Sequence, residues 1–438
     1  MKLLQIKMYK KVIYITAIIV SVCGLGVKAQ ITTASPYSRY GLGNIKGSLL
    51  PQLRAMGGIS TAVNKVTGFN YINMQNPASY GGINLTTIDI GMSSSYTTLS
   101  RGDLSENSFN ATLSHVALAI PVSRKSAISF GILPYSDLGY SYRNTTTVDT
   151  VSADQLYQGE GGLSKAYFGY GQTIGDHLRI GGNVEYLFGN LQTTRAVEYT
   201  ETGALNAKLI NKNAVGGFNF SYGIQYDFNI GKKTSVTLGY SGSTAGKVYS
   251  TQSFYATRYT RDLTTGNENT AIDTLSTIEN GKSNLTLPLT HNFGIAIQQN
   301  DKWLIGADFR MGKWSATSIN GVNQGLQDSW GASLGGQFTP DYTSYNSYFK
   351  RVDYRLGVSY DKTYINVNGQ DIKQMAASFG FGFPLPSANA GTAFYKINFT
   401  TEIGQRGTLN NGLVKEQYIN FHLGFTLNDT WFRRYRVD

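Results

Sequence analysis

Cysteine is nearly absent from this sequence of 438 residues, in which Cys23 is the only one. A single cysteine forms neither an internal disulfide nor a thiolate metal cluster. Proline is scarce, with 9 residues. No internal apolar run approaches the ~18 residues of a membrane-spanning helix, and we find no convincing amphipathic helix after Gly82. These absences exclude a disulfide-stapled domain and a helical membrane protein.

The first residues have the pattern of an export signal. Four lysines within the first eleven residues form a basic region, and Val12–Val22 is an apolar stretch too short to span a bilayer comfortably. Val27-Lys28-Ala29 then supplies a small-x-Ala cleavage site, so we predict that residues 1–29 are a signal peptide and that Gln30 begins the mature chain. The alternative is a lipoprotein signal at Cys23, which fits less well because a bulky valine precedes it.

Removal of this segment changes the charge of the protein. Residues 1–29 contain five lysines and no acidic residue, so their loss lowers the net charge from +11 to +6 and leaves 409 residues. A mildly basic, exported chain is a weak match to nucleic-acid binding, and we expect no nucleic-acid partner.

Strict alternation of apolar and polar residues is the main structural signal. In Phe218–Ile230, apolar and aromatic residues occupy one face and polar or small residues the other, without exception over thirteen residues. Tyr418–Leu427 repeats this pattern. Fourteen such segments can be recognised, near residues 86–99, 108–122, 126–142, 161–174, 178–199, 215–230, 234–252, 284–299, 302–317, 326–339, 350–366, 370–384, 393–406 and 414–430.

These segments predict an all-β fold: a transmembrane antiparallel β-barrel of about 14 strands. About ten alternating residues cross an outer membrane at a tilt, whereas strands of soluble sandwiches have about five or six. A soluble β-sandwich or β-helix is the alternative, but the strand length and the lack of a fixed repeat argue against it. Long polar connections are expected at Arg143–Gly159 and Thr257–Lys282.

The segment before the first strand is compact but has no clear periodicity. Arg54–Gly82 is rich in glycine and small residues, is almost uncharged, and contains too many apolar residues for a solvated tail. We therefore expect it to fold against the inside of the barrel. The predicted organisation is a signal peptide (1–29), an N-terminal hatch in the lumen (30–85), the barrel (86–430) and an aromatic, basic tail (431–438).

This segment also carries a family resemblance. Arg54-Ala55-Met56-Gly57-Gly58 with Ala62, followed by Asn76-Pro77-Ala78 just before the first long strand, resembles the FadL family of outer-membrane transporters of hydrophobic compounds and long-chain fatty acids. With the fourteen strands, the resemblance covers essentially the whole mature chain. Ser35–Gly43 (SPYSRYGLG) is similar to outer-membrane proteins of Bacteroidota.

The resemblance implies a function and a location. It implies a porin-like channel in the outer membrane, in contact with its lipid, that takes up fatty-acid-like hydrophobic molecules passively. The hatch would plug the lumen, and a kink in the third strand would open a lateral exit to the membrane. The expected hatch residues are Arg54, Gly57, Gly58, Asn76, Pro77 and Ala78.

The third predicted strand contains its own candidate for such a kink. Pro134 donates no ladder hydrogen bond, and Gly131 and Gly139 flank it where no side chain resists a bend. The alternative is a proline near the end of a strand, beside a loop.

Cations on the inward faces are candidate ligand contacts, because a carrier of amphipathic acids needs a positive charge near an apolar pocket. The candidates are Arg179, Arg310, Arg355 and Lys396, each near an acid in the sequence (Glu185, Asp308, Asp353 and Glu402). Ion pairs that hold the barrel's shape explain these residues equally well. The resemblance assigns no ligand residue.

Signatures of catalysis and metal binding are missing from the sequence. We find no G-x-S-x-G, no H-E-x-x-H, no P-loop lysine and no calcium-loop spacing, and we expect no enzyme activity, cofactor or metal site. The second functional hypothesis is a non-transporting barrel that serves a larger outer-membrane secretion or assembly complex, like PorV-type barrels resembling the same family. Trp431–Asp438 would then be a candidate contact.

Overall fold

The computed structural model describes residues 35–64, 69–148, 151–201, 203–231, 233–262, 264–386 and 393–431. The predicted signal peptide and residues 432–438 of the predicted tail lie outside them. All of the described residues belong to one compact unit. In the described part of the chain, no helix is long and apolar enough to cross a membrane.

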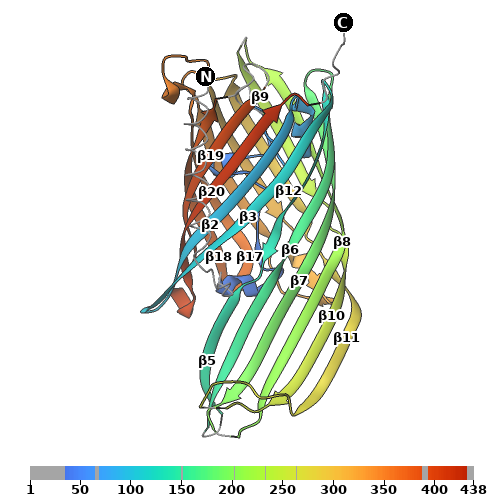
Figure 1. Ribbon diagram of the computed structural model, residues 1–438, viewed down its shortest axis with the longest axis vertical. Helices are drawn as coiled ribbons and strands as arrows, with labels where there is room; N and C mark the ends of the chain where they lie inside the picture. Colours follow the sequence, from blue (N-terminus) through green and yellow to red (C-terminus); the bar gives the residue numbers. More distant parts are fainter. Residues whose placement is uncertain are drawn as a thin grey trace, which may run out of the picture. The chain divides into compact units, whose positions relative to one another are not determined.

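The unit is a closed antiparallel barrel of 14 strands, which confirms the predicted fold class (Figure 1). Each strand pairs with the next, and the last pairs with the first, with Thr86 opposite Asp429 and Ser100 opposite Lys415. In order around the barrel, the strands are β2 (Thr86–Arg101), β3 (Leu104–Ser123), β4 (Ser126–Asp137), β6 (Val151–Ile174), β7 (Leu178–Tyr199), β8 (Asn206–Asn229), β9 (Thr234–Ser243), β12 (Thr290–Gln299), β13 (Trp303–Gly312), β16 (Ser329–Phe338), β17 (Asp353–Val367), β18 (Gln370–Leu385), β19 (Phe394–Gly407) and β20 (Lys415–Asp429).

The remaining elements are short or lie outside this ring. They are η1 (Pro36–Arg39), β1 (Asn44–Ile45), α2 (Pro51–Arg54), η2 (Pro77–Gly82), β5 (Tyr140–Val148), β10 (Lys247–Tyr259), β11 (Asp273–Thr286), η3 (Trp314–Ala316), β14 (Ser318–Ile319), β15 (Val322–Asn323), η4 (Tyr348–Arg351) and η5 (Asn410–Gly412).

Three of the predicted strands are broken in two. Residues 126–142 become β4 and the start of β5, residues 234–252 become β9 and part of β10, and residues 284–299 become the end of β11 and β12. The predicted loop Arg143–Gly159 is wrong, because these residues belong largely to the β5–β6 hairpin. The predicted loop Thr257–Lys282 likewise contains the ends of β10 and β11.

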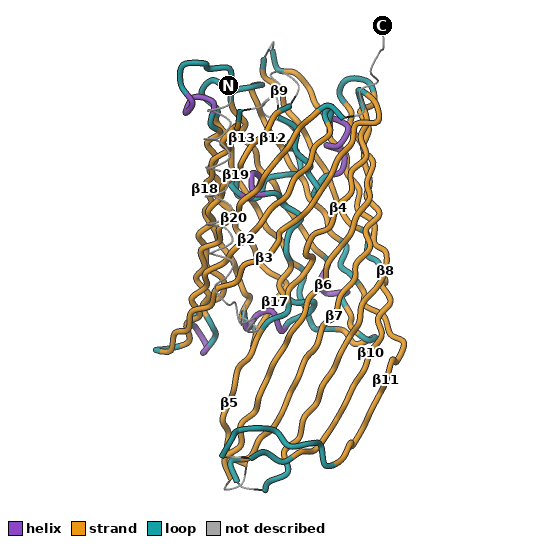
Figure 2. The backbone as a smooth tube through the Cα atoms, in the orientation of Figure 1, coloured by secondary structure: helices purple, strands orange, loops and turns teal. Residues whose placement is uncertain are grey.

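The two segments that were predicted as loops belong to an extension of the barrel beyond its other strands. Strands β5, β6, β7, β8, β10 and β11 pair in that order and run well beyond the other strands, at the bottom of Figures 1 and 2. We name this six-stranded sheet the outer extension. It lies at the end opposite the β3–β4, β6–β7, β8–β9 and β12–β13 turns, all of which are short. In membrane barrels the long extensions of the strands face the outside of the cell.

The two faces of the wall differ in polarity as the alternation predicted. On β8, the aromatic side chains of Phe218 and Phe220 are 61% and 52% exposed on the outer face. Asn219 and Gln225, on the inner face of the same strand, are buried. An apolar outer band over a polar interior is the pattern of a barrel surrounded by lipid.

The residues before β2 lie inside this barrel. We name described residues 35–64 and 69–85 the inner segment. Its apolar residues form a buried cluster with small side chains of the wall, including Ala117 and Ala127. Members of the cluster from the inner segment include Leu50, Leu53, Met56, Ile59, Val63, Ile72, Met74 and Tyr80.

Glycines on the inner face of the wall allow the inner segment to approach closely. A Cβ atom on Gly357 would lie 2.1 Å from the amide nitrogen of Gly57, and one on Gly335 would lie 2.2 Å from the carbonyl oxygen of Met56. Such distances are far below normal contact, so only glycine fits. Eleven wall glycines come within 3 Å of the inner segment in this sense: Gly169, Gly171, Gly181, Gly223, Gly239, Gly294, Gly335, Gly357, Gly380, Gly407 and Gly424.

We predict that Gly357→Ala destabilises the protein by about 1–3 kcal/mol, because the new methyl group must displace the main chain of the inner segment. The measurement is the free energy of unfolding in urea, in lipid vesicles. Gly182→Ala is the matched control, since Gly182 faces outward on β7 and its nearest contact would be 3.6 Å away. Equal effects of the two substitutions would contradict the role of the glycines.

Candidate functional site

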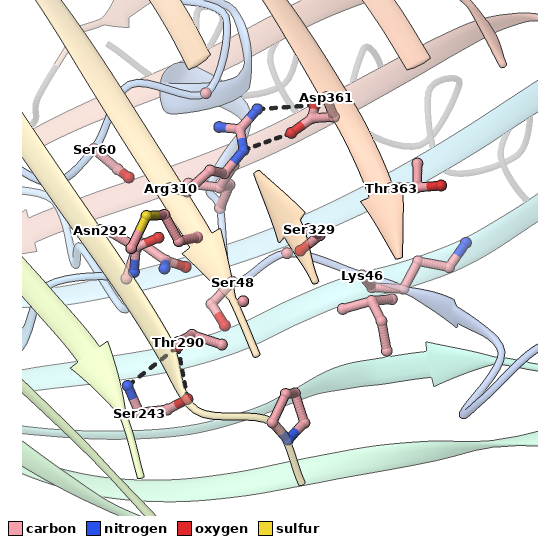
Figure 3. Close-up of a pocket in the computed structure, with 18 of the residues that line it drawn as sticks. Lys46, Ser48, Ser60, Ser243, Thr290, Asn292, Arg310, Ser329, Asp361 and Thr363 are labelled. Carbon is pink, nitrogen blue, oxygen red and sulfur yellow. Dashed lines mark hydrogen bonds and ion pairs between the residues drawn. The ribbon is translucent and has the colours of Figure 1, made fainter. Parts of the chain in front are cut away.

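Two cavities lie between the inner segment and the wall. The lumen cavity, of about 430 Å³, is bordered by the inner segment and by side chains from β8, β12, β13, β16 and β17 (Figure 3). The gap cavity, of about 420 Å³, is bordered by the inner segment, β3, β4 and β6. The two share the residues Lys46, Gly47, Leu49, Arg54 and Met74.

The lumen cavity is lined by polar groups that are largely paired. Arg310 donates through Nε and Nη2 to both carboxylate oxygens of Asp361, at 2.8 and 2.9 Å, as Figure 3 shows. Lys165 donates to Glu185 at 2.8 Å. Bidentate and charge-assisted hydrogen bonds of this kind fix side-chain geometry.

Asp308 of β13 holds the inner segment to the wall. Its Oδ2 atom accepts hydrogen bonds from the amides of Ser60 and Thr61, at 2.7 and 2.8 Å, and from the Thr61 hydroxyl at 2.8 Å. Asp308 is 6% exposed. A buried carboxylate that satisfies two main-chain donors is costly to remove, because both donors lose their partner.

The wall is interrupted between β3 and β4. Ladder pairing of these strands ends at Val116 and Ile132. Among the described strands, Leu104–His115 of β3 has no partner on that side, whereas the end of β4 continues along β6. The inner segment takes the place of β3 there, since Asn44 and Ile45 pair with Asp137 and Ser136. We name this interruption the wall gap.

The gap cavity opens onto this interruption. Its lining includes Asn110, Thr112, Leu113 and Ser114 of the unpaired part of β3, Leu133, Pro134, Ser136 and Asp137 of β4, and Gly161–Ser164 of β6. The apolar part of the lining comes from Leu49, Met74, Leu113, Leu133, Pro134 and Leu163. The cavity therefore adjoins both the lumen cavity and the broken edge of the wall.

The predicted hatch residues all belong to the inner segment. Arg54 ends α2, and Gly57 and Gly58 follow it with φ of +69° and +84°, which favours glycine. Asn76 caps η2 by accepting from the Ala78 amide at 3.1 Å. It also donates to the Thr61 carbonyl at 2.7 Å. Pro77 and Ala78 lie in η2 and are buried. A movable hatch remains a prediction.

The three predicted kink residues lie along the wall gap. Gly131 pairs with Ala117 close to the last β3–β4 pair. Pro134 follows that pair, and the ladder to β6 shifts register between Pro134 and Ser136. Gly139 lies between β4 and β5, where its carbonyl accepts from the Ser35 amide at 3.0 Å. Their role in a lateral exit remains a prediction.

The four predicted ligand cations are all ion-paired. Arg179 pairs with Asp227, Arg310 with Asp361, and both Arg355 and Lys396 with Asp353. Of the four, only Arg310 borders one of the two large cavities. Lys396 also lies 3.7 Å above the ring of Phe69, so it fixes the inner segment. This arrangement matches the alternative interpretation of lumen ion pairs, and ligand contact remains a prediction.

Lys46 and His422 also border the cavities, although the sequence did not predict them as site residues. Lys46 follows β1 at the junction of the two cavities, and desolvation in the lumen lowers the pKa of its ammonium group, which Asp137 partly offsets. His422 of β20 borders the gap cavity. No sequence signal distinguishes them, because their position depends on how the inner segment is threaded.

One Ser-His-Asp arrangement occurs in the wall. Nδ1 of His115 lies 2.9 Å from the Ser114 hydroxyl, and Nε2 lies 2.7 Å from Asp89. The imidazole and the carboxylate are almost completely buried, and Ser114 is the extra residue where β2 and β3 shift register. We interpret the group as support for this bulge. The described residues contain no group of three His, Cys, Asp or Glu that would hold a metal ion.

Comparisons with known proteins found a matching family model and solved structures with a similar fold. A family model described as BamG matches residues 8–438. The chain is similar to the Ralstonia pickettii toluene transporter TbuX, with 16% identity, 88% of this chain and 99% of that chain covered, and a TM-score of 0.57. It is also similar to a Pseudomonas aeruginosa FadL homologue, with 11% identity, coverage of 89% and 100%, and a TM-score of 0.57.

A third similar structure is CymD, a monoaromatic hydrocarbon channel, with 14% identity, coverage of 90% and 100%, and a TM-score of 0.52. A search of curated proteins found no match. At these identities the likeness concerns the fold, and at that level it agrees with the predicted FadL resemblance. These neighbours are channels rather than enzymes. A Bacteroidota type remains a prediction.

We predict that Asp308→Ala loosens the inner segment and lowers the free energy of unfolding by about 2–3 kcal/mol, because two buried amides lose their acceptor. The measurement is hydrogen exchange of the Ser60 and Thr61 amides, which should become much faster. Asp176→Ala is the control, since Asp176 lies exposed in the β6–β7 turn. Unchanged exchange in Asp308→Ala would show that this carboxylate does not anchor the segment.

Proposed function

The chain belongs to the BamG family, and from its barrel architecture we propose that it is an outer-membrane channel for passive uptake of hydrophobic, fatty-acid-like compounds. The observation that carries this proposal is the wall gap beside the gap cavity. A pore that crosses the whole membrane would release its cargo into water. A cavity that adjoins a break in the wall offers a route into the lipid instead.

The proposed path begins at the outer rim and ends in the membrane. A compound enters the lumen cavity past the outer extension, passes the residues that the two cavities share, and leaves between β3 and β4 near Pro134. The apolar side chains of Leu113 and Leu133 border this exit. The support for a sideways exit is that the buried cluster of the inner segment fills the lumen on the periplasmic side.

The inner segment acts as the hatch in this proposal. It contacts the wall through side-chain anchors such as Asp308 and Asn76 rather than through a continuous ladder. Its β1 lies along β4 at the wall gap, so a shift of Asn44–Lys46 changes the width of the exit. Passage would therefore need a local displacement near the gap, not removal of the whole segment.

We predict that closing the wall gap stops uptake. Asn110→Cys on β3 and Ser164→Cys on β6, both at the gap cavity, are bridged with bis-maleimides of increasing length in a Cys23→Ala background. Uptake of a fluorescent fatty acid should fall to the background of membranes without the protein, because the exit is blocked. Pro134→Ala, which lets β4 follow β3 further, should reduce uptake in the same assay.

The matched control bridges two periplasmic turns instead. Lys125→Cys and Asp176→Cys lie where the native side chains meet at 2.8 Å. This bridge leaves the gap untouched and should leave uptake unchanged. Full uptake with the gap bridged and with Pro134→Ala would refute lateral exit.

A second candidate function is that of a subunit in a larger outer-membrane complex. Its support is the outer extension, whose two border strands have free edges. Tyr140–Val148 of β5 and Asp273–Ser283 of β11 have no ladder partner on one side among the described strands. Such edges accept strands of other proteins. A stoichiometric partner after gentle purification would favour this function, and a lone barrel with bound lipid would favour the channel.

A further inference from the structure

Two cations occupy the junction of the lumen cavity and the gap cavity. Arg54 of α2 and Lys46 after β1 border both cavities. They therefore face any molecule that passes from one cavity to the other. The cations elsewhere in the lumen cavity, such as Lys165 and Arg310, are held by carboxylates.

Arg54 has no such partner. Its Nε and Nη2 atoms donate only to the carbonyl oxygens of Leu49 and Gly47, at 3.3 and 3.0 Å. Among the described residues, no carboxylate lies within ion-pair distance of it. Glu402 affects Arg54 only over a longer distance and accepts a hydrogen bond from Asn420. The guanidinium group thus keeps free donors and an unpaired positive charge.

Lys46 is only loosely compensated. Its Nζ atom lies 3.7 Å from Asp137, well beyond the 2.8 Å of the Lys165–Glu185 pair. Arg54 and Arg406 both act on Lys46 by charge repulsion. An additional negative charge at this junction would relieve that repulsion.

A third polar group, on the gap-cavity side of the junction, also lacks a partner among the described residues. His422 borders the gap cavity and is only 6% exposed, and its buried Nε2 atom has no hydrogen-bond partner among the described residues. Arg54 and Lys46 are the two charges that act on its imidazole. Buried polar atoms normally find partners, so this one points to a bound group that the described residues do not supply.

We propose that Arg54, Lys46 and His422 form a binding site for the oxyanion head group of an amphiphile, whose apolar tail extends into the gap cavity. Arginine and lysine are donors without acceptors, and they suit a carboxylate or phosphate group. Leu49, Leu113 and Leu133 supply the apolar surface for the first part of the tail. The site rests on the proposed path for its biological meaning, but binding itself needs no transport.

This site sets a preference within the proposed cargo. A neutral hydrocarbon at the junction would leave both cations unpaired and would remove water from them without compensation. An anionic amphiphile gives each cation a partner and still buries its tail. The cargo class is therefore amphiphilic acids or phosphates, in contrast to toluene, which the name of TbuX gives as the compound that transporter carries.

The test is a binding titration of the purified full chain in lipid nanodiscs with decyl phosphate, decanoate, decanol and inorganic phosphate. Trp314 and Trp330 border the lumen cavity, so tryptophan fluorescence reports occupancy. Both anionic amphiphiles should bind about tenfold or more tightly than decanol, because only they form charge-assisted hydrogen bonds. Equal binding of decanol would overturn the proposal. Inorganic phosphate as tight as decyl phosphate would indicate a free-anion site and would overturn the role of the tail.

The variants assign the effect to these residues. Arg54→Gln and Lys46→Gln should each weaken the binding of decyl phosphate about tenfold and leave decanol unchanged. Arg54→Lys, which keeps the positive charge, should retain part of the affinity for decyl phosphate that Arg54→Gln loses. Lys362→Gln is the matched control, since Lys362 borders the lumen cavity but pairs with Asp371. If Arg54→Gln does not fold, Lys46→Gln still decides the outcome. If the native protein binds decyl phosphate tightly but takes up no fatty acid, the binding site is supported and only the proposed channel function is refuted.

Discussion

The close contact between the main chain of the inner segment and the wall is the constraint on which the structure depends. Peptide groups inside a barrel need hydrogen-bond partners, because water reaches them poorly. Wall side chains larger than hydrogen would hold the segment too far away for the anchors at Asp308 and Ser378 to reach it. The row of glycines, of which Gly335 and Gly357 are examples, removes that obstacle. The high glycine content of the chain thus has a structural reason in the barrel's interior.

The wall gap depends on the same need of peptide groups for hydrogen-bond partners. An open strand edge that faces lipid costs several kcal/mol for each unsatisfied group, so membrane barrels close their ladders. Here the end of β4 pairs with the inner segment instead of β3, through Asn44, Ile45 and the amide of Lys46. The free edge of β3 borders a cavity with polar residues such as Asn110 and Thr112. The wall can therefore be open only because the inner segment is in place.

The sequence predicted the barrel well and its outer part poorly, for one physical reason. Strands that face lipid need a continuous apolar face, and this produces the alternation seen in Phe218–Ile230. Beyond the membrane no such face is needed, so Thr145–Thr147 of β5 looked like a loop. The inward cations were identified by alternation, but the partner of Arg179 is Asp227 on the next strand rather than Glu185. Register between strands, which decides such pairs, leaves no trace in one sequence.

Arg54 links the cavities to the contact between the inner segment and the wall. Wall cations such as Lys165 and Arg179 pair with carboxylates on a neighbouring strand, and rigid strands keep these pairs together. Arg54 is part of the inner segment, and among the described residues its guanidinium group is held only by carbonyl groups of that segment. Its own carbonyl accepts from the amide of Gly57, one of the points where the segment touches the wall. A negative charge bound to Arg54 would therefore act on the same turn that fixes the segment, and would couple the occupancy of the cavities to the position of the inner segment.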